Sequence, residues 1–137
     1  MRIALVVPGG VDRSGEYRVI PVLLALISRL ARQNDVHVYA LNQESEQSDW
    51  VLDAATIHNI GSRRSRVRAV RAICTAHRKL RFDLVQAIWS GACGMVAVLC
   101  GTGCGAACMR NAQLLDRSRK ARPGAARLSR RAIHAVH

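Results

Sequence analysis

Apolar and polar residues follow one another along the chain in blocks that predict strands and helices in turn. Four short apolar runs bounded by turn-forming or charged residues have the pattern of buried strands, and they cover residues 2–7, 36–42, 56–61 and 82–89. Over 20–33 and 62–82, apolar side chains recur every three or four positions, which predicts two helices. A run of small residues from Ser90 predicts the start of a third helix, and the polar stretch 43–50 is expected to be a surface loop.

This order of elements predicts an α/β fold built on an open parallel sheet. The buried stripe of the first helix is expected to contain Val22, Leu23, Leu26, Ile27, Leu30 and Ala31, with Pro21 in the first turn. That of the second helix is expected to contain Val67, Val70, Ile73, Cys74, His77 and Leu80. His77 lies on this stripe and His37 and His58 lie inside strands, so all three are assigned structural roles.

The length of 137 residues suits one domain, and the charge of the chain is strongly basic, with 21 Lys and Arg against 9 Asp and Glu. An excess of this size favours phosphate-bearing or otherwise anionic partners without choosing among them. "IALVV" is too short for the apolar region of a secretory signal, so we expect the chain in the cytoplasm. Five cysteines, an odd number, then favour free thiols. Their spacing, without a C-x-x-C pair, gives no reason to expect a metal.

The residues from Gly101 onward differ from the rest of the chain. Ala, Arg and Gly dominate this segment and no apolar run in it predicts a strand. We therefore expect residues 101–137 to be a poorly ordered basic tail. Its composition also fits an out-of-frame reading of a GC-rich gene. The hypothesis is a frameshift or truncation near residue 100, and reading the downstream DNA in its other two frames tests it.

The stretch "PGGVDRSG" follows the first strand and contains the adjacent glycines Gly9 and Gly10. Glycines after a buried strand let backbone N–H groups come close to a phosphate, and a following helix N-terminus favours an anion. The stretch does not have the dinucleotide spacing G-x-G-x-x-G, and a plain tight turn has the same composition. From these residues alone, both a turn and a ligand-binding loop remain open.

A wider match adds to this reading. The segment "MRIALVVPGGVDRSGEYRVIPVLLALISRLARQNDVHVYAL", followed in order by "IHNIG", the basic helix and "FDLVQAIWSG", resembles the N-terminal domain of family 4 glycosyltransferases over about residues 1–100. The resemblance implies a Rossmann-like domain, the acceptor-side half of a GT-B fold. It also implies a hexosyltransferase-type activity that moves a sugar from a nucleotide-sugar donor to a sugar or lipid-linked acceptor, without a metal or other cofactor. Gly9 and Gly10 are then the loop beside the donor phosphates, with Arg13 and Arg18 as further candidates for phosphate contact.

Two departures limit what the resemblance implies. Where many relatives have histidines in the fourth strand, this chain has Gln86 and Ile88, and glutamine cannot exchange a proton near neutral pH. The donor-binding domain of the family, with its paired glutamates, has no counterpart in these residues, so the fold is expected to be incomplete. We expect this chain alone to be inactive as a transferase, and no catalytic residue is assigned.

The alternative from another class is a non-catalytic basic module. The 62–82 helix has an arginine-rich face that could contact anionic lipid, which would place the protein at the inner face of the membrane. Nucleic acid is a less favoured partner, because the tail has no aromatic residue for base stacking. The uncharged stretch from Leu84 to Met109 is long enough to span a membrane, but its opening reads better as a buried strand followed by a helix.

Overall fold

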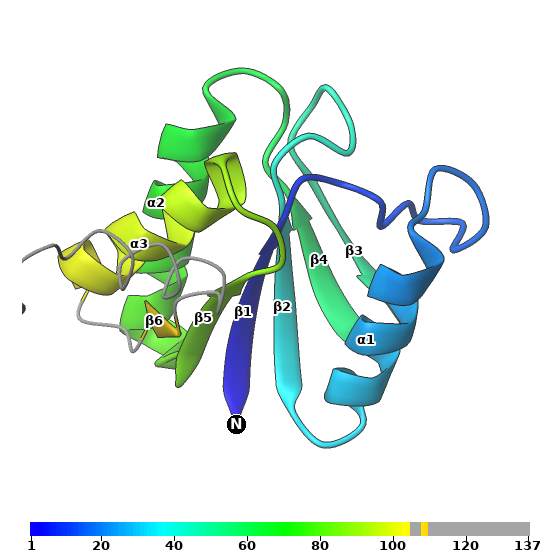
Figure 1. Cartoon of the computed structure of the whole chain (residues 1–137), viewed down its shortest axis with the longest axis horizontal. Coiled ribbons are helices and arrows are strands. Elements are labelled where there is room, and N and C mark those ends of the chain that lie inside the picture. The colour runs from blue at the N-terminus through cyan, green and yellow to red at the C-terminus, as the bar shows by residue number, and fades with distance from the viewer. Residues whose placement is uncertain (105–107, 110–137) are drawn as a thin grey trace, which may run out of the picture.

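A computed structural model describes residues 1–104 and 108–109 of the chain. These residues form an α/β fold in which helices cover both faces of a six-stranded sheet (Figure 1). The strands are β1 (Arg2–Val7), β2 (Asp35–Ala40), β3 (Ser48–Leu52), β4 (Ala55–Asn59), β5 (Leu84–Ala87) and β6 (Cys108–Met109). The helices are α1 (Pro21–Ala31), α2 (Ser65–Leu80) and α3 (Ala92–Cys104).

The sheet is mixed but mostly parallel, in the order β3-β4-β2-β1-β5-β6. Of the strands described, only β3 runs antiparallel, against its neighbour β4. From β1 the chain builds outward through β2 to β4, and then α2 carries it back across the sheet to β5 on the other side of β1. The direction of strand addition therefore reverses between β1 and β5, and the loops that follow these two strands begin side by side.

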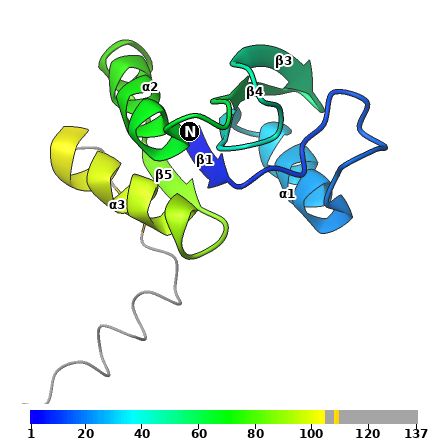
Figure 2. The ribbon, with the colours of Figure 1, turned by 90° about the horizontal axis from the view of Figure 1, so that it is seen from above.

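The core is divided by the sheet into two apolar clusters. Alternate residues of β1 point to opposite faces, so Ala4 and Val6 join the cluster under α2 and α3. Ile3, Leu5 and Val7 join the cluster under α1. Figure 2, which views the ribbon from above, shows α1 on one side and the α2–α3 pair on the other. A strand buried on both faces needs an uninterrupted apolar run, which is why "IALVV" does not alternate.

The stretch 43–50 is not only a surface loop, and this expectation was wrong for its second half. Ser48 begins β3, an edge strand in which Trp50 and Leu52 pack against the cluster under α1. Strands β3 and β4 form a hairpin whose two loop residues, Asp53 and Ala54, both have positive φ. A two-residue hairpin turn requires this geometry and usually contains glycine, so the turn lacks its ordinary sequence signal.

The two amphipathic helices are confirmed, but their buried faces are narrower than the apolar stripes predicted. Leu23 and Ile27 are the fully buried side chains of α1, whereas Val22 is 72% exposed and Leu26 38%. In α2, Val67 is 55% exposed, and Ala69 and Ile73 are buried. Each helix packs on the sheet along one line, which leaves the outer apolar side chains of the stripe in solvent.

The third helix crosses the boundary that the sequence suggests at residue 100 and continues to Cys104. The prediction of no strand after Gly101 was wrong, because Cys108 and Met109 pair in parallel with β5. Residues 110–137, which make up most of the expected basic tail, lie outside the described residues. In the part of the chain that the structure describes, no helix is long and apolar enough to cross a membrane.

Candidate functional site

The candidate site is the edge of the sheet at which the parallel strands end. Open α/β sheets bind ligands beyond the carboxyl ends of their strands, at the position where the strand order reverses. Here that position lies between the ends of β1 and β5. The loops nearest to it are 8–20 after β1, 41–47 after β2 and 88–91 after β5.

The loop after β1 is closed on itself by backbone hydrogen bonds. Val11 and Val19 form an isolated antiparallel bridge, and the Ile20 N–H donates to the Gly10 carbonyl at 3.0 Å. Inside this closure, the Asp12 carboxylate accepts from the Ser14 hydroxyl at 2.8 Å and from its N–H at 3.2 Å. These bonds lower the pKa of Asp12. The loop is therefore a fixed substructure rather than a loose connection.

Both predicted glycines lie in tightly packed positions, and Gly10 is required by the packing of the chain itself. Gly10 has a φ of +82°, and a Cβ atom there would lie 2.6 Å from the Ile20 side chain. A Cβ atom at Gly9 would lie 3.3 Å from the Gln43 Oε1 atom and 3.4 Å from the Asn42 carbonyl oxygen. The first position needs glycine for its backbone conformation as well as for space, and the second is tight against the loop after β2.

The backbone N–H groups of Gly10 and Val11 both point at one atom. The Oε1 atom of Gln43 accepts from the Gly10 N–H at 2.6 Å and from the Val11 N–H at 3.0 Å. Gln43 is only 3% exposed, so its amide group is part of the interior of this edge. Sequence reasoning missed Gln43, because it lies in a polar stretch that gives no signal of burial.

The two arginines suggested for phosphate contact also have partners within the protein. Arg18 donates from Nη2 to the Gln43 backbone carbonyl at 2.6 Å. Arg13 donates two hydrogen bonds of 3.0 Å to the Glu44 carboxylate. Its guanidinium also lies 4.9 Å from the Trp50 ring centre. The Arg13–Glu44 hydrogen bonds raise the pKa of Arg13 and lower that of Glu44.

A second residue that the sequence reasoning missed holds the 43–46 segment in place. Asn59, the last residue of β4, is fully buried, and its Oδ1 atom accepts from the N–H groups of Gln43 at 3.1 Å and Glu44 at 3.2 Å. Its Nδ2 atom donates to the carbonyl oxygens of Glu44, at 3.1 Å, and Glu46. The position of Gln43 against the glycine loop therefore depends on a side chain two strands away from β1.

In the described part of the chain, the β5 side of the edge has few groups suited to chemistry. Gln86 and Ile88, the positions that the resemblance aligns with histidines, are partly buried, and Ser90 and Gly91 are exposed. Cys93, in the first turn of α3, is buried, and burial raises its pKa to about 11, which makes it a poor nucleophile. Among the residues described, no three His, Cys, Asp or Glu side chains converge on a point that could hold a metal.

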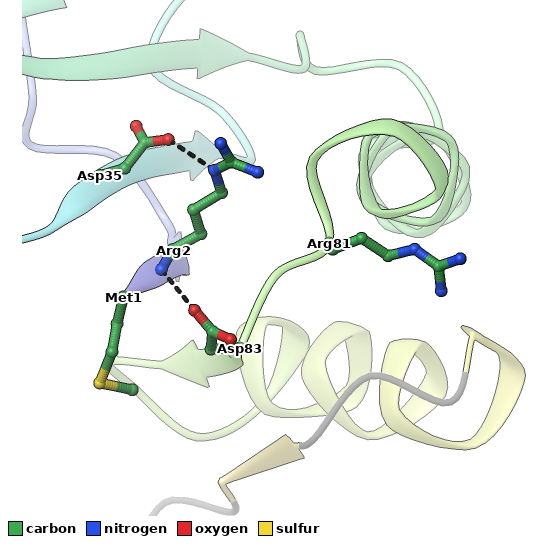
Figure 3. A pocket seen from close by; sticks show the side chains of 5 residues that line it. All are labelled: Met1, Arg2, Asp35, Arg81 and Asp83. Carbon is green, nitrogen blue, oxygen red and sulfur yellow. Dashed lines mark hydrogen bonds and ion pairs between the residues drawn. The ribbon is translucent and has the colours of Figure 1, made fainter.

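Two open hollows on the described surface lie away from this edge. One, of about 360 Å³, is on the outer face of α1 and is lined by Ala25, Ser28, Arg29 and Arg32. The other, of about 440 Å³, is at the opposite, amino end of the strands and is lined by Met1, Arg2, Asp35, Arg81 and Asp83. Figure 3 shows Arg2 between the carboxylates of Asp35 and Asp83, with Arg81 directed away from them. Asp35 forms an ion pair with Arg2, with Oδ2 3.1 Å from Arg2 Nε, and Asp83 accepts a hydrogen bond of 2.7 Å from the Arg2 backbone N–H.

The remaining predicted residues are cysteines and histidines outside the edge. Cys93 is a free thiol, whereas Cys74 is disulfide-bonded, which corrects the expectation of free thiols at that position. His77 accepts a hydrogen bond from the Phe82 N–H at 3.0 Å, at the end of α2. His37 and His58 contact each other on the face of the sheet that α2 and α3 cover.

Comparison of the chain with protein-family models, with curated proteins and with solved structures finds no match.

Proposed function

We propose that residues 1–104 are the acceptor-side, Rossmann-like domain of a nucleotide-sugar-dependent glycosyltransferase of the GT-B type. In this proposal the parent reaction transfers a sugar from the donor to a sugar or lipid-linked acceptor. The glycine loop approaches the donor phosphates, and most of the donor is bound by a second domain that faces this one. These 137 residues alone are then expected to transfer little or no sugar.

One observation supports the proposal above the others. The N–H groups of Gly10 and Val11 converge on a single oxygen atom, at the edge where strand order reverses. Two backbone donors aimed at one acceptor are the arrangement that binds an anionic oxygen. The amide oxygen of Gln43 occupies this position, and in the proposal an oxygen of the donor phosphate replaces it.

Binding of a phosphate then requires rearrangement of side chains but not of the loop backbone. Gln43 has to turn its amide away from Gly10 and Val11. Arg13 becomes available for the anion when it leaves Glu44, and it is 53% exposed in that ion pair, so solvent already reaches it. Solvent-exposed ion pairs contribute little to stability, so a phosphate can compete with Glu44 for this arginine.

The experiment measures the binding of UDP-sugars and GDP-sugars to the full chain, with ligand-detected NMR as the readout. The proposal predicts weak binding that requires the diphosphate, so the nucleotide-sugar binds and the free sugar does not. The matched variants are Gly10→Ala, which alters the loop, and Gly91→Ala, which also changes a glycine of positive φ but has no atom within 4 Å of the added Cβ. Binding of no nucleotide-sugar, or equal binding by the Gly10→Ala variant, would reject the proposal.

A second candidate function is attachment to an anionic surface through α2. The eight basic side chains in and beside this helix are all exposed, and they are Arg63, Arg64, Arg66, Arg68, Arg71, Arg78, Lys79 and Arg81. Sedimentation with vesicles that contain 30% phosphatidylserine tests this function at 50 and 300 mM salt. A surface binder pellets with the vesicles at low salt and is released at high salt, whereas a domain that uses only its glycine loop does not pellet.

A further inference from the structure

Four side chains form a continuous line of contacts across three strands. The Nε2 atom of His37 lies 3.3 Å from Asp35 Oδ1, and its Nδ1 atom lies 3.1 Å from His58 Nε2. The Nδ1 atom of His58 lies 2.9 Å from Asp49 Oδ1. Both nitrogens of both imidazoles are therefore in contact, and a carboxylate stands at each end of the line.

The line connects β2, β4 and the edge strand β3. Asp35 and His37 are on β2, while His58 on β4 is directly opposite Asp49 on β3. The two imidazole rings are parallel to within 1°. Their side chains are 13% and 24% exposed, so water reaches the pair only in part.

Among the described residues, few other titratable groups face the pair. Besides burial, the positive charge of Arg2, on β1, lowers the pKa of His37. Arg2 also forms an ion pair with the other oxygen of Asp35, as Figure 3 shows. From β2, the ring of Tyr39 stacks on His58 with ring centres 4.8 Å apart. From α2, His77 is separated from His37 by the Phe82 ring, which contacts both. Burial raises the pKa of the Tyr39 hydroxyl most, and Cys100, on α3, is one of the groups that raise it further.

The number of protons on the two imidazoles determines how many contacts in this line can be hydrogen bonds. Its three contacts, one to each carboxylate and one between the rings, need three N–H donors. Two neutral imidazoles supply two, so in that state one contact lacks its hydrogen. One added proton supplies the third donor, and every contact is then a hydrogen bond. A second added proton places two N–H groups face to face across 3.1 Å, where they repel.

We propose that His37 and His58 bind one proton between them as a unit, and that a second proton breaks their contact and loosens the β3–β4 hairpin from β2. The broken contact joins β4 to β2, whereas His58 keeps its contact with Asp49, so the hairpin is weakened at its link to the rest of the sheet. Acidification therefore opens this edge in one step, whereas the singly protonated line holds it closed.

The burial of His37, like the repulsion between two protonated rings, disfavours its protonation. Loss of solvent is the largest cause that lowers the pKa of His37 from its ordinary 6.5, with Asp35 opposing the shift. Since the folded state then binds the proton less readily than the unfolded state, the contribution of His37 to stability is present above pH 6.5 and is lost as the pH falls below it.

The first test follows the imidazole ¹⁵N resonances of the wild-type chain between pH 8 and pH 4. The variants His37→Gln and His58→Gln assign the signals, because the chain contains five histidines. The proposal predicts two uptake steps about two pH units apart or more, both of them seen at both residues, because the macroscopic steps belong to the pair. Independent titration of the two residues, with midpoints within about half a unit, would overturn it.

The second test measures hydrogen exchange of the β3 and β4 amides at a pH between the two uptake steps and at a pH below the lower step, corrected for the intrinsic rates. In the wild type, protection of β3 and β4 is expected to fall about tenfold or more below the lower step, while that of β1 changes little. In His37→Gln, which retains His58 and Asp49, the pH dependence of β3 is expected to vanish. A wild-type pH dependence that persists in this variant would also overturn the proposal.

Discussion

The side-chain oxygen of Gln43 lies 2.6 Å from the backbone nitrogen of Gly10 and accepts its hydrogen bond. Gln43 thereby fills the space in front of the glycine loop, with Val11 as the second donor. The loop is thus both a tight, self-packed turn and a pair of donors aimed at one oxygen. These two readings of "PGGVDRSG" are compatible, since a preformed donor pair satisfied by an amide needs no backbone change to accept an anion.

The backbone of the glycine loop should tolerate no side chain at residue 10. Gly10→Ala combines positive φ with a contact of 2.6 Å to Ile20, so we expect a loss of about 2–4 kcal/mol in the free energy of unfolding. Gly91→Ala has a φ of +77° and no close atom, so it should lose only about 1–2 kcal/mol. Urea unfolding of both variants measures the difference. Equal losses would show that Ile20 does not confine the loop.

Asn59 should be a major determinant of order at the carboxyl edge. Asn59→Ala leaves two N–H groups and two carbonyl oxygens of the 43–46 segment without their partner, which predicts a loss of about 2–4 kcal/mol. The control is Asn42→Ala, at an exposed side chain of the neighbouring loop, with an expected change within about 0.5 kcal/mol. Chemical denaturation compares the two variants. A loss below about 1 kcal/mol for Asn59→Ala would contradict the network described.

Acid should weaken the contact between the glycine loop and the loop after β2. The Arg13 hydrogen bonds lower the pKa of Glu44 below its ordinary 4.5. The folded state therefore releases this proton more readily than the unfolded state. Stability from Glu44 is present above pH 4.5 and is lost as the pH falls through the lower folded value. Glu44→Gln should reduce the fall in Tm between pH 5 and pH 3, whereas Glu16→Gln, which removes a carboxylate outside this ion pair, should not. Identical pH profiles for wild type and Glu44→Gln would argue against the pair.

The alternation of strands and helices was predictable because it depends on long apolar runs. A parallel sheet covered on both faces requires strands such as 2–7, and the narrow burial of α1 and α2 still leaves a clear helical period. The edge strand β3 gave no such signal. Two of its five side chains are exposed, none is fully buried, and its turn at Asp53 and Ala54 lacks glycine.

The candidate site was only partly predictable. Gly9 and Gly10 could be singled out because glycine pairs after a strand are visible in sequence. Gln43 and Asn59, which determine what the loop contacts, are polar residues whose burial arises from contacts between segments 13 to 33 positions apart. No local pattern records such pairing. For the same reason, the internal partners of Arg13 and Arg18 could not be foreseen from their charge.

The central claim is that the Gly10 and Val11 N–H groups bind a phosphate oxygen when Gln43 releases them. The direct measurement is the change in their amide ¹⁵N and ¹H shifts as UDP is added to the wild-type chain and to Gln43→Ala. The account predicts selective shifts at these two amides in both proteins, with tighter binding in Gln43→Ala because no side chain competes for the donors. Unchanged Gly10 and Val11 shifts in both proteins, at UDP concentrations that shift other amides, would contradict it.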